Sequence, residues 1–296
     1  RNCSLLYKKE VLALEKAALI LEGGAIRGLF TAGALDYLLE QNMQFEYVAS
    51  VSAGTCCALS YIAEQKNRTK NCLFPTNKSD EWIGKGSLKR GKGLIDLKKA
   101  FYEFPYKQYP FRFDKYFASK VTNEIVVTSL ETGKAEFLTE KSDEKRLLNI
   151  GAASSSLPII SKAVKIDGKK YYDGGVSDSL PYERAMELGY KKIVVIQTRR
   201  LHQYPSSSKG MDLLYKAKFA LHKDFLNTML SRPETYKKQA EQLAELEKEN
   251  KVFVIRPTIP EISRTEDDYN KKITYYNHGY SQMRAGFNDL QEYLNS

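Results

Sequence analysis

Histidine, cysteine and long apolar runs are scarce in this sequence, and each scarcity excludes a class of protein. Three histidines and four cysteines in 296 residues show no spacing typical of a zinc site, so we expect no metal centre. Four cysteines in so long a chain make no disulfide framework, which favours a reducing, cytoplasmic setting. No run approaches the roughly 20 apolar residues that a membrane-spanning helix needs. The chain begins at Arg1 and not at Met, which leaves open whether a leader precedes it.

The composition is that of an ordinary globular protein, but its positive charge is concentrated in one stretch. Apolar residues make up 42% and charged residues 28%, which is enough apolar material for a sizeable core. The formal net charge is +10, and residues 66–120 hold fourteen Lys and Arg against five Asp and Glu, a net of +9. Such a block indicates an anionic partner: nucleic acid, a phospholipid surface or an acidic protein.

Strand patterns and helix patterns alternate along most of the chain. A strand pattern at 18–21 runs through a glycine turn into a helix pattern at 29–41, and a strand at 45–51 precedes a helix that begins at 53. This rhythm predicts an α/β fold with a mostly parallel sheet and helices on both faces. Further strands are expected at 124–128, 135–138, 163–166, 169–172, 193–196 and 252–255. Further helices are expected at 145–153, 181–188, 211–250 and 269–294.

We interpret residues 1–296 as a single domain with an inserted cap. The core is expected over about 17–200 and a helical extension over about 205–296. The stretch 66–120 breaks the α/β rhythm, is rich in Lys, Gly and aromatics, and is interpreted as the cap.

The cap contains nine Phe and Tyr residues between positions 101 and 117, interleaved with cations. Three interpretations are open: a lid that packs its rings on the core, a surface for anionic membrane lipids, or a platform on which single-stranded nucleic acid stacks. We favour the lid, place peripheral membrane contact through 66–120 next, and do not expect nucleic acid as the partner.

The segment Ser50-Val51-Ser52-Ala53-Gly54 places a serine between small residues, after a strand and before a helix. This is the setting of a nucleophile elbow, in which a tight turn needs small neighbours and lifts the serine oxygen above the sheet. The helix N-terminus beside it favours a developing negative charge. An ordinary helix N-cap by Ser50 or Ser52 is the competing interpretation.

A glycine-rich loop lies between the first strand and the first helix. It consists of Gly23, Gly24, Ala25, Ile26, Arg27 and Gly28. The spacing does not match a dinucleotide-binding fingerprint, and Leu29-Phe30 stand where a P-loop requires Lys and Ser or Thr, so nucleotide binding is disfavoured. An oxyanion hole and a tight turn without a ligand both remain open.

Asp173, Gly174 and Gly175 form the third motif, an acid at the end of a strand before two glycines. Asp-Gly alone is mostly a turn signal, so Asp173 gains interest only as a base for Ser52.

In this order the three motifs resemble the patatin-like phospholipase family, whose signature is a glycine-rich loop with a basic residue, a G-x-S-x-G elbow and an Asp-Gly-Gly/Ala motif. The similarity covers most of residues 18–290 and is weakest in 66–120. It implies a three-layer α/β/α fold with a mostly parallel central sheet and an inserted cap region. It also implies hydrolysis of a phospholipid or lysophospholipid ester, of phospholipase A or lysophospholipase type, with no cofactor.

The resemblance implies roles for individual residues. Ser52 would be the nucleophile and Asp173 its sole partner, a dyad without histidine that works through an acyl-enzyme. Backbone amides of Gly24 and Ala25, with that of Ala53, would stabilise the oxyanion, and Arg27 would hold the loop. His202, His222 and His278 are expected at the surface.

Two positions depart from the family pattern. Ala25 replaces a glycine and resists a positive φ, so a flipped peptide is not expected there. Ser50 replaces the first glycine of the elbow and is small enough to fit. Two alternatives to an enzyme stay open: a catalytically weak lipid-surface binding protein on the same fold, and a nucleic-acid-binding module built on the basic insert.

Overall fold

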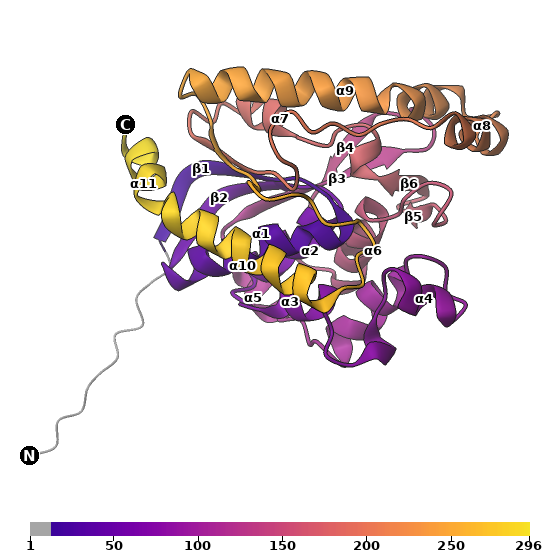
Figure 1. Cartoon of the computed structure of the whole chain (residues 1–296), viewed down its shortest axis with the longest axis horizontal. Coiled ribbons are helices and arrows are strands. Elements are labelled where there is room, and N and C mark those ends of the chain that lie inside the picture. Colours follow the sequence, from indigo (N-terminus) through magenta and orange to yellow (C-terminus); the bar gives the residue numbers. More distant parts are fainter. Residues whose placement is uncertain (1–12) are drawn as a thin grey trace, which may run out of the picture.

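The computed structural model describes residues 13–296, and a sheet runs through the middle of this region (Figure 1). Its strands are β1 (Ala13–Leu21), β2 (Met43–Ser50), β3 (Thr122–Ser129), β4 (Ala135–Leu138), β5 (Val164–Ile166), β6 (Lys169–Asp173), β7 (Ile193–Ile196) and β8 (Phe253–Ile255). They lie in the order β5-β6-β3-β2-β1-β7-β8, and β4 pairs with β3 off this path. The run β3-β2-β1-β7-β8 is parallel, whereas β4, β5 and β6 pair antiparallel. This confirms the expected α/β fold with a mostly parallel sheet.

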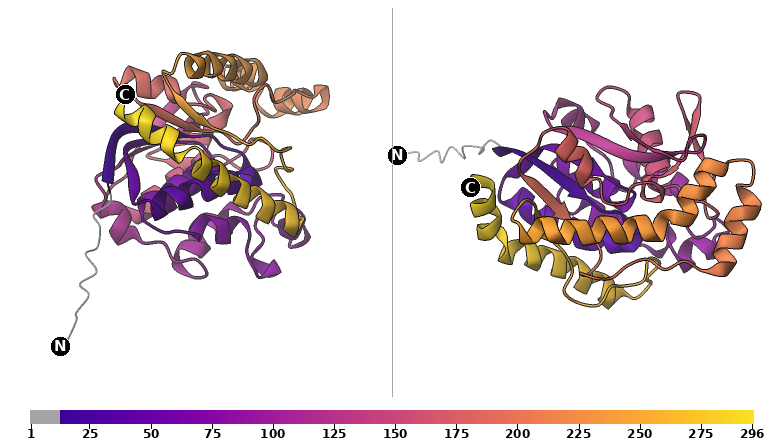
Figure 2. Two further views of the ribbon diagram at one scale, coloured as in Figure 1. Left: turned by 60° about the vertical axis from the view of Figure 1, so that its left-hand side comes forward. Right: turned by 90° about the horizontal axis from the view of Figure 1, so that it is seen from above.

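Helices cover both faces of the sheet (Figure 1, Figure 2). They are α1 (Gly28–Glu40), α2 (Ala53–Ile62), α3 (Arg68–Leu73), α4 (Lys85–Lys89), α5 (Phe113–Ala118), α6 (Glu144–Ser154), α7 (Tyr182–Glu187), α8 (Lys209–Lys218), α9 (Lys223–Lys248), α10 (Tyr269–Ala285) and α11 (Phe287–Asn295). In Figure 1, α7 and α9 lie above the sheet, and α1, α2 and α10 lie below it.

The central strand β1 is buried on both sides because of these two helical layers. Leu19 and Leu21 pack into the core shared with α1 and α2, whereas Ala18 and Ile20 pack into the core shared with α7 and α9. A parallel strand between two layers needs apolar side chains on both faces, which explains the uninterrupted apolar run in the sequence.

Two segments expected to be helical, 211–250 and 269–294, each form two helices in the structure. The segment 211–250 forms α8 and α9, because Phe219 turns inward after α8 and packs against Tyr172 and Phe225. The segment 269–294 forms α10 and α11, which meet at Gly286. Patterns of charge and apolar spacing predicted the helical state but not these breaks.

The insert 66–120 contains short helices and most of its aromatic rings are buried. The rings of Phe101, Phe104, Phe111, Phe113 and Tyr116 are at most 9% exposed. Four of them pack edge to face or tilted on neighbouring rings of the insert. The interpretation of these rings as a lid that packs on the core fits this arrangement, and only Tyr102 and Tyr106 among the nine are exposed.

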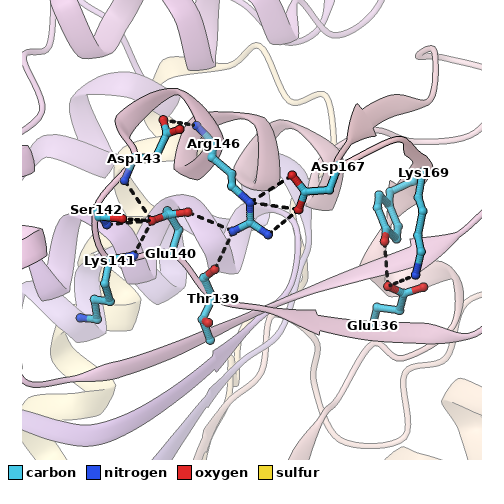
Figure 3. Close-up of polar contacts among 10 residues, drawn as sticks. Glu136, Thr139, Glu140, Lys141, Ser142, Asp143, Arg146, Asp167 and Lys169 are labelled. Carbon is cyan, nitrogen blue, oxygen red and sulfur yellow. Dashed lines mark hydrogen bonds and ion pairs between the residues drawn. The ribbon is translucent and has the colours of Figure 1, made fainter.

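Arg146 fastens the start of α6 to the hairpin of β5 and β6 (Figure 3). Its guanidinium donates to Asp167, at 2.7 Å from Nη2, and to Glu140, at 3.0 Å from Nη1. Glu140 also accepts from the amides of Ser142 and Asp143; burial raises the pKa of Glu140, but these hydrogen bonds and Arg146 lower it to about 2. Because β6 ends in Asp173 and α6 ends in Ser154, this network holds two elements that reach the cleft described below.

Helices α1 and α10 cross at a pair of glycines. A Cβ atom on Gly33 would lie 2.1 Å from the Tyr276 carbonyl oxygen, and one on Gly279 would lie 1.9 Å from the Phe30 carbonyl oxygen. The two backbones therefore touch, and α10 packs along α1 in a way that no side chain at either position permits.

Gly279→Ala should lower the free energy of unfolding by about 1–3 kcal/mol, because the added methyl forces the two helices apart. Urea unfolding measures the change. The matched control is Gly210→Ala in α8, where the nearest atom to the new Cβ lies 3.9 Å away. There the same substitution should leave stability unchanged or raise it by up to about 0.5 kcal/mol, because Gly210 lies in the first turn of α8 and nothing must move to admit the methyl. Equal effects at both positions would contradict the close crossing.

Candidate active site

The register of the sheet brings Ser52 and Asp173 together. Ser52 follows β2, which pairs with β3 through Ser50 and Ile125, and β3 pairs with β6 through Val127 and Asp173. Both residues therefore stand at the carboxyl edge of the parallel strands, where ligand sites of such sheets form. The Ser52 hydroxyl donates a 2.7 Å hydrogen bond to Asp173 Oδ2, across 121 positions of sequence.

Ser52 sits on a strained turn between β2 and α2. Its backbone has φ 54° and ψ −120°, a region that L-residues rarely adopt. The Ser52 amide donates to Ser154 Oγ at 2.9 Å, and the Gly54 amide donates to the Val51 carbonyl at 2.8 Å. A Cβ on Gly54 would lie 2.5 Å from the Leu21 carbonyl oxygen, so only glycine fits there. The geometry is that of a nucleophile elbow.

The competing interpretation of this turn, a side-chain cap on α2, is wrong. The Ser52 side chain makes no capping hydrogen bond and reaches Asp173 instead. The Ser50 hydroxyl is fully buried and has no hydrogen-bond partner within residues 13–296. Ser50 thus fits the space of the family's glycine, but leaves a polar atom unpaired.

Asp173 is 2% exposed and is held through both carboxylate oxygens. While Oδ2 accepts from Ser52, Oδ1 accepts from the Gly175 amide at 2.8 Å. Burial raises the pKa of Asp173 above its ordinary value, and Arg232, Ser52, Gly175 and Arg264 act in the opposite direction. A carboxylate with a raised pKa is a better proton acceptor than an ordinary aspartate.

The glycine-rich loop lies directly against the serine. A Cβ on Gly23 would stand 2.9 Å from Ser52 Cβ, and Gly24, Ala25 and Ala53 line the same cleft. Within the described chain, the amides of Gly24, Ala25 and Ala53 donate no hydrogen bond to protein. Unpaired amides beside a serine hydroxyl are the donors that an oxyanion hole requires.

Ala25 adopts the conformation that its side chain was expected to resist. Its φ is +52°, in the left-handed region, so the expectation from the missing glycine is wrong. The C-terminal segment holds the loop in this shape. The Ile26 amide donates to the Arg264 carbonyl at 3.3 Å, and Arg27 Nε donates to the Ile262 carbonyl at 2.8 Å.

A buried polar network behind the loop escaped the sequence analysis. Glu22 accepts from the Thr198 amide at 2.6 Å and from the Tyr236 hydroxyl at 2.8 Å, and the Thr198 hydroxyl donates to the Gly23 carbonyl at 2.7 Å. Burial raises the pKa of Glu22, and Arg199 lowers it. An acid at the end of the apolar run 18–21 is the signal that could have indicated this site.

The walls of the cleft differ in chemistry. Trp82, Ile83 and Ile95 of the insert form an apolar wall, and an adjoining apolar cavity continues into the insert beyond Cys56 and Leu73. That cavity is lined also by Leu59, Ala100, Phe101, Phe104, Phe111 and Leu148. The opposite wall carries Arg199, Arg232 and Arg264. The candidate site therefore has an apolar end and a cationic end.

The remaining chemically reactive side chains do not join Ser52 and Asp173. None of His202, His222 and His278 lines the cleft, and His278 Nε2 accepts from the Thr258 amide at 3.0 Å. Cys56 does line it, but burial raises the pKa of its thiol to about 12, which keeps the thiol protonated. Over residues 13–296 no group of His, Cys, Asp and Glu side chains is arranged to bind a metal ion.

Comparisons with known proteins give two family matches, one sequence relative and one solved structure of limited similarity. A model of the patatin-like phospholipase family matches residues 19–186, and a domain of unknown function, DUF6363, matches residues 222–295. The Escherichia coli (strain K12) protein YjjU, described as uncharacterized, is 30% identical over 205 residues, which are 67% of this chain and 56% of YjjU. The chain thus spans about half the length of that relative. The crystal structure of VipD from Legionella pneumophila has a TM-score of 0.47 and 13% identity, over 95% of this chain and 67% of that one.

Ala25→Gly should raise the free energy of unfolding by about 0.5–1 kcal/mol. Relief of the left-handed strain, about 1–2 kcal/mol, exceeds the added chain entropy of glycine. Urea unfolding gives the value. Ala240→Gly, in the interior of α9, is the control and should lose about 1 kcal/mol. A loss of the same size at Ala25 would refute its left-handed conformation.

Proposed function

This chain belongs to the patatin-like phospholipase family, and from that membership and the pairing of Ser52 with Asp173 we propose that it is a serine acyl hydrolase. Its substrates would be lipid esters cleaved in the manner of a phospholipase A or a lysophospholipase. The observation that carries the proposal is the 2.7 Å hydrogen bond from the Ser52 hydroxyl to a buried carboxylate, beside amides that have no acceptor.

The proposed reaction proceeds through an acyl-enzyme. Ser52 Oγ attacks the ester carbonyl carbon while Asp173 Oδ2 takes its proton, and the amides of Gly24, Ala25 and Ala53 stabilise the oxyanion. The tetrahedral intermediate collapses, the leaving alcohol receives the proton from Asp173, and the acyl group stays on Ser52. Asp173 then takes a proton from water, the hydroxide attacks the acyl carbonyl, and the proton returns to Ser52 as the fatty acid leaves.

The apolar cavity beyond Cys56 and Leu73 suits the acyl chain. It adjoins the cleft through these residues and Trp82, and its other walls are apolar apart from Arg68 and Thr69. An acyl chain lying there would place its carbonyl at Ser52 and direct the alcohol toward the opposite wall.

Ser52→Ala should lower ester hydrolysis by about 10³-fold or more, because no other nucleophile replaces its hydroxyl. Asp173→Asn should be nearly as damaging, since an amide accepts no proton. Hydrolysis of a soluble chromogenic acyl ester measures both, and labelling by a fluorophosphonate followed by peptide identification locates the nucleophile.

The control for this pair is the combined replacement of His202, His222 and His278 by Gln. A folded triple variant should keep its activity, because none of these rings lines the cleft. Loss of activity in that variant would replace the dyad by a triad. Wild-type protein that neither hydrolyses the ester nor reacts with the fluorophosphonate would favour the lipid-surface binding alternative.

We further propose that the cleft opens toward an anionic lipid surface. The short helix α4, which follows the cleft residues Trp82 and Ile83, exposes Leu88 by 58% beside the exposed Lys89 and Lys92. Helix α8 exposes Leu213 by 69%, and α4 and α8 lie at the same end of the molecule (Figure 1). Apolar side chains among cations suit a membrane interface, whereas the buried rings of the insert leave few surfaces for base stacking. No helix in residues 13–296 is both long and apolar enough to cross a bilayer.

Lys89→Glu with Lys92→Glu should reduce hydrolysis in anionic vesicles several-fold, because each cation near an anionic leaflet contributes about 1 kcal/mol. Turnover of a soluble short-chain ester should stay within twofold. Lys16→Glu with Lys191→Glu changes the charge equally at exposed positions near the amino ends of β1 and β7, away from the cleft, and should spare both substrates. Equal effects of the two double variants on vesicle activity would mean that the cations of the insert only solvate it.

A further inference from the structure

Three arginines converge on the wall of the cleft opposite the apolar cavity. Arg199 follows β7, Arg232 lies within α9, and Arg264 precedes α10; all three line the cleft that contains Ser52 and Asp173. The same three side chains also line a polar pocket that extends away from Ser52, toward 204–208 and α8. This pocket and the apolar cavity share no residue, so the cleft lies between them.

The positive charge of this wall is only partly neutralised by protein. Arg199 Nε lies 3.7 Å from Glu22 Oε1, an oxygen that already accepts from Tyr236. Within residues 13–296, Arg232 and Arg264 form no side-chain hydrogen bond and no ion pair, and Arg232 Nε is buried without a partner. Unpaired guanidinium groups in a partly buried wall are costly unless an anion occupies the space between them.

The arginines also repel one another. Burial lowers the pKa of Arg264 to about 10, and the charges of Arg232, Arg199 and Arg27 act in the same direction. Arg27 lines the same polar pocket and adds to this repulsion, and its Nε donates to the Ile262 carbonyl. Planar guanidinium groups with free N–H donors are the side chains best suited to a tetrahedral oxyanion such as phosphate.

We propose that Arg199, Arg232 and Arg264 form a phosphate-binding subsite beside Ser52, which selects acyl esters whose leaving alcohol carries a phosphate. The inference rests on the proposed function. It adds the orientation of the substrate, with the acyl chain in the apolar cavity, the carbonyl at Ser52 and the phosphate on the arginines. Two of the three arginines come from the segment 222–295, so this segment takes part in substrate selection.

The test compares two soluble esters with the same short acyl chain, a monoacylglycerol and its glycerol-phosphate counterpart. Wild type should prefer the phosphate ester in kcat/KM, and Arg232→Gln and Arg264→Gln should each lower the ratio of the two values tenfold or more. Both arginines also act on the pKa of Asp173, so the change in the ratio is compared with binding to Ser52→Ala, which involves no proton transfer. Arg200→Gln is the matched control, since Arg200 pairs with Glu261 and does not line the cleft; it should keep the ratio of wild type.

Binding to Ser52→Ala separates failure of the subsite from failure of the proposed function. This variant should bind the phosphate ester at least tenfold more tightly than the monoacylglycerol, and Arg232→Gln in the same background should abolish the difference. Arginine-dependent binding without hydrolysis by wild type would overturn the hydrolase and keep the subsite. Hydrolysis with equal kcat/KM for both esters, or equal losses on both in the arginine variants, would overturn the subsite alone.

Inorganic phosphate distinguishes a lipid headgroup from the free ion. Phosphate alone should inhibit hydrolysis of both esters only weakly, because it lacks the acyl chain that anchors the ester. An arginine-dependent rise in Tm with millimolar phosphate, together with no selectivity between the esters, would assign the arginines to free phosphate and overturn substrate selection.

Discussion

The hydrogen bond between Ser52 and Asp173 is the contact on which the rest of the cleft depends. It requires β2, β3 and β6 to lie in one register, because the serine and the acid reach it from strands far apart in sequence. It also requires an unfavourable backbone at Ser52, which is held by the Ser154 hydroxyl and by the close approach of Gly54 to β1. The strained turn at Ser52 raises the free energy of the folded state. The packing of the sheet offsets this cost, as is usual at functional sites. The strain of this turn lies at Ser52 alone, whereas the contacts that keep Ser52 in this conformation depend on the whole sheet.

The C-terminal segment is part of this cleft and not an appendage to it. Helix α10 packs along α1 through the contact of Gly33 with the Tyr276 carbonyl. The carbonyls of Ile262 and Arg264 accept from the glycine-rich loop, and so hold the amides that face the serine. Arg232 adds charge to the far wall. Residues 19–186 match the patatin-like family. Residues that match DUF6363 contribute to one wall of the cleft and hold the glycine-rich loop in place.

The parts of the fold that follow from short patterns could be predicted, and those that depend on distant contacts could not. The strands at 18–21 and 193–196 follow from a few adjacent residues, and the structure contains both. The separation of α8 from α9 depends on Phe219 meeting Tyr172 and Phe225, which no local pattern shows. The resemblance of the motifs to those of the patatin-like family identified Ser52, Asp173 and the glycine-rich loop as candidates. The glycines are informative because only glycine fits where two backbone segments are in contact. The arginines of the cleft carry no such mark, since an arginine in a charged helix or a polar loop looks like any solvated residue.

The charges around Asp173 connect binding with chemistry. Burial raises the pKa of this carboxyl, whereas the charges of Arg232 and Arg264 lower it. An unliganded cleft therefore holds a base whose strength is reduced by cations on the opposite wall. In the proposed subsite a bound phosphate would neutralise these cations. The rise in the pKa of Asp173 that burial causes would then be less opposed. The carboxylate would then become more basic when an ester lies against Ser52, so that recognition of the alcohol half of the substrate would strengthen the group that we propose takes the serine proton.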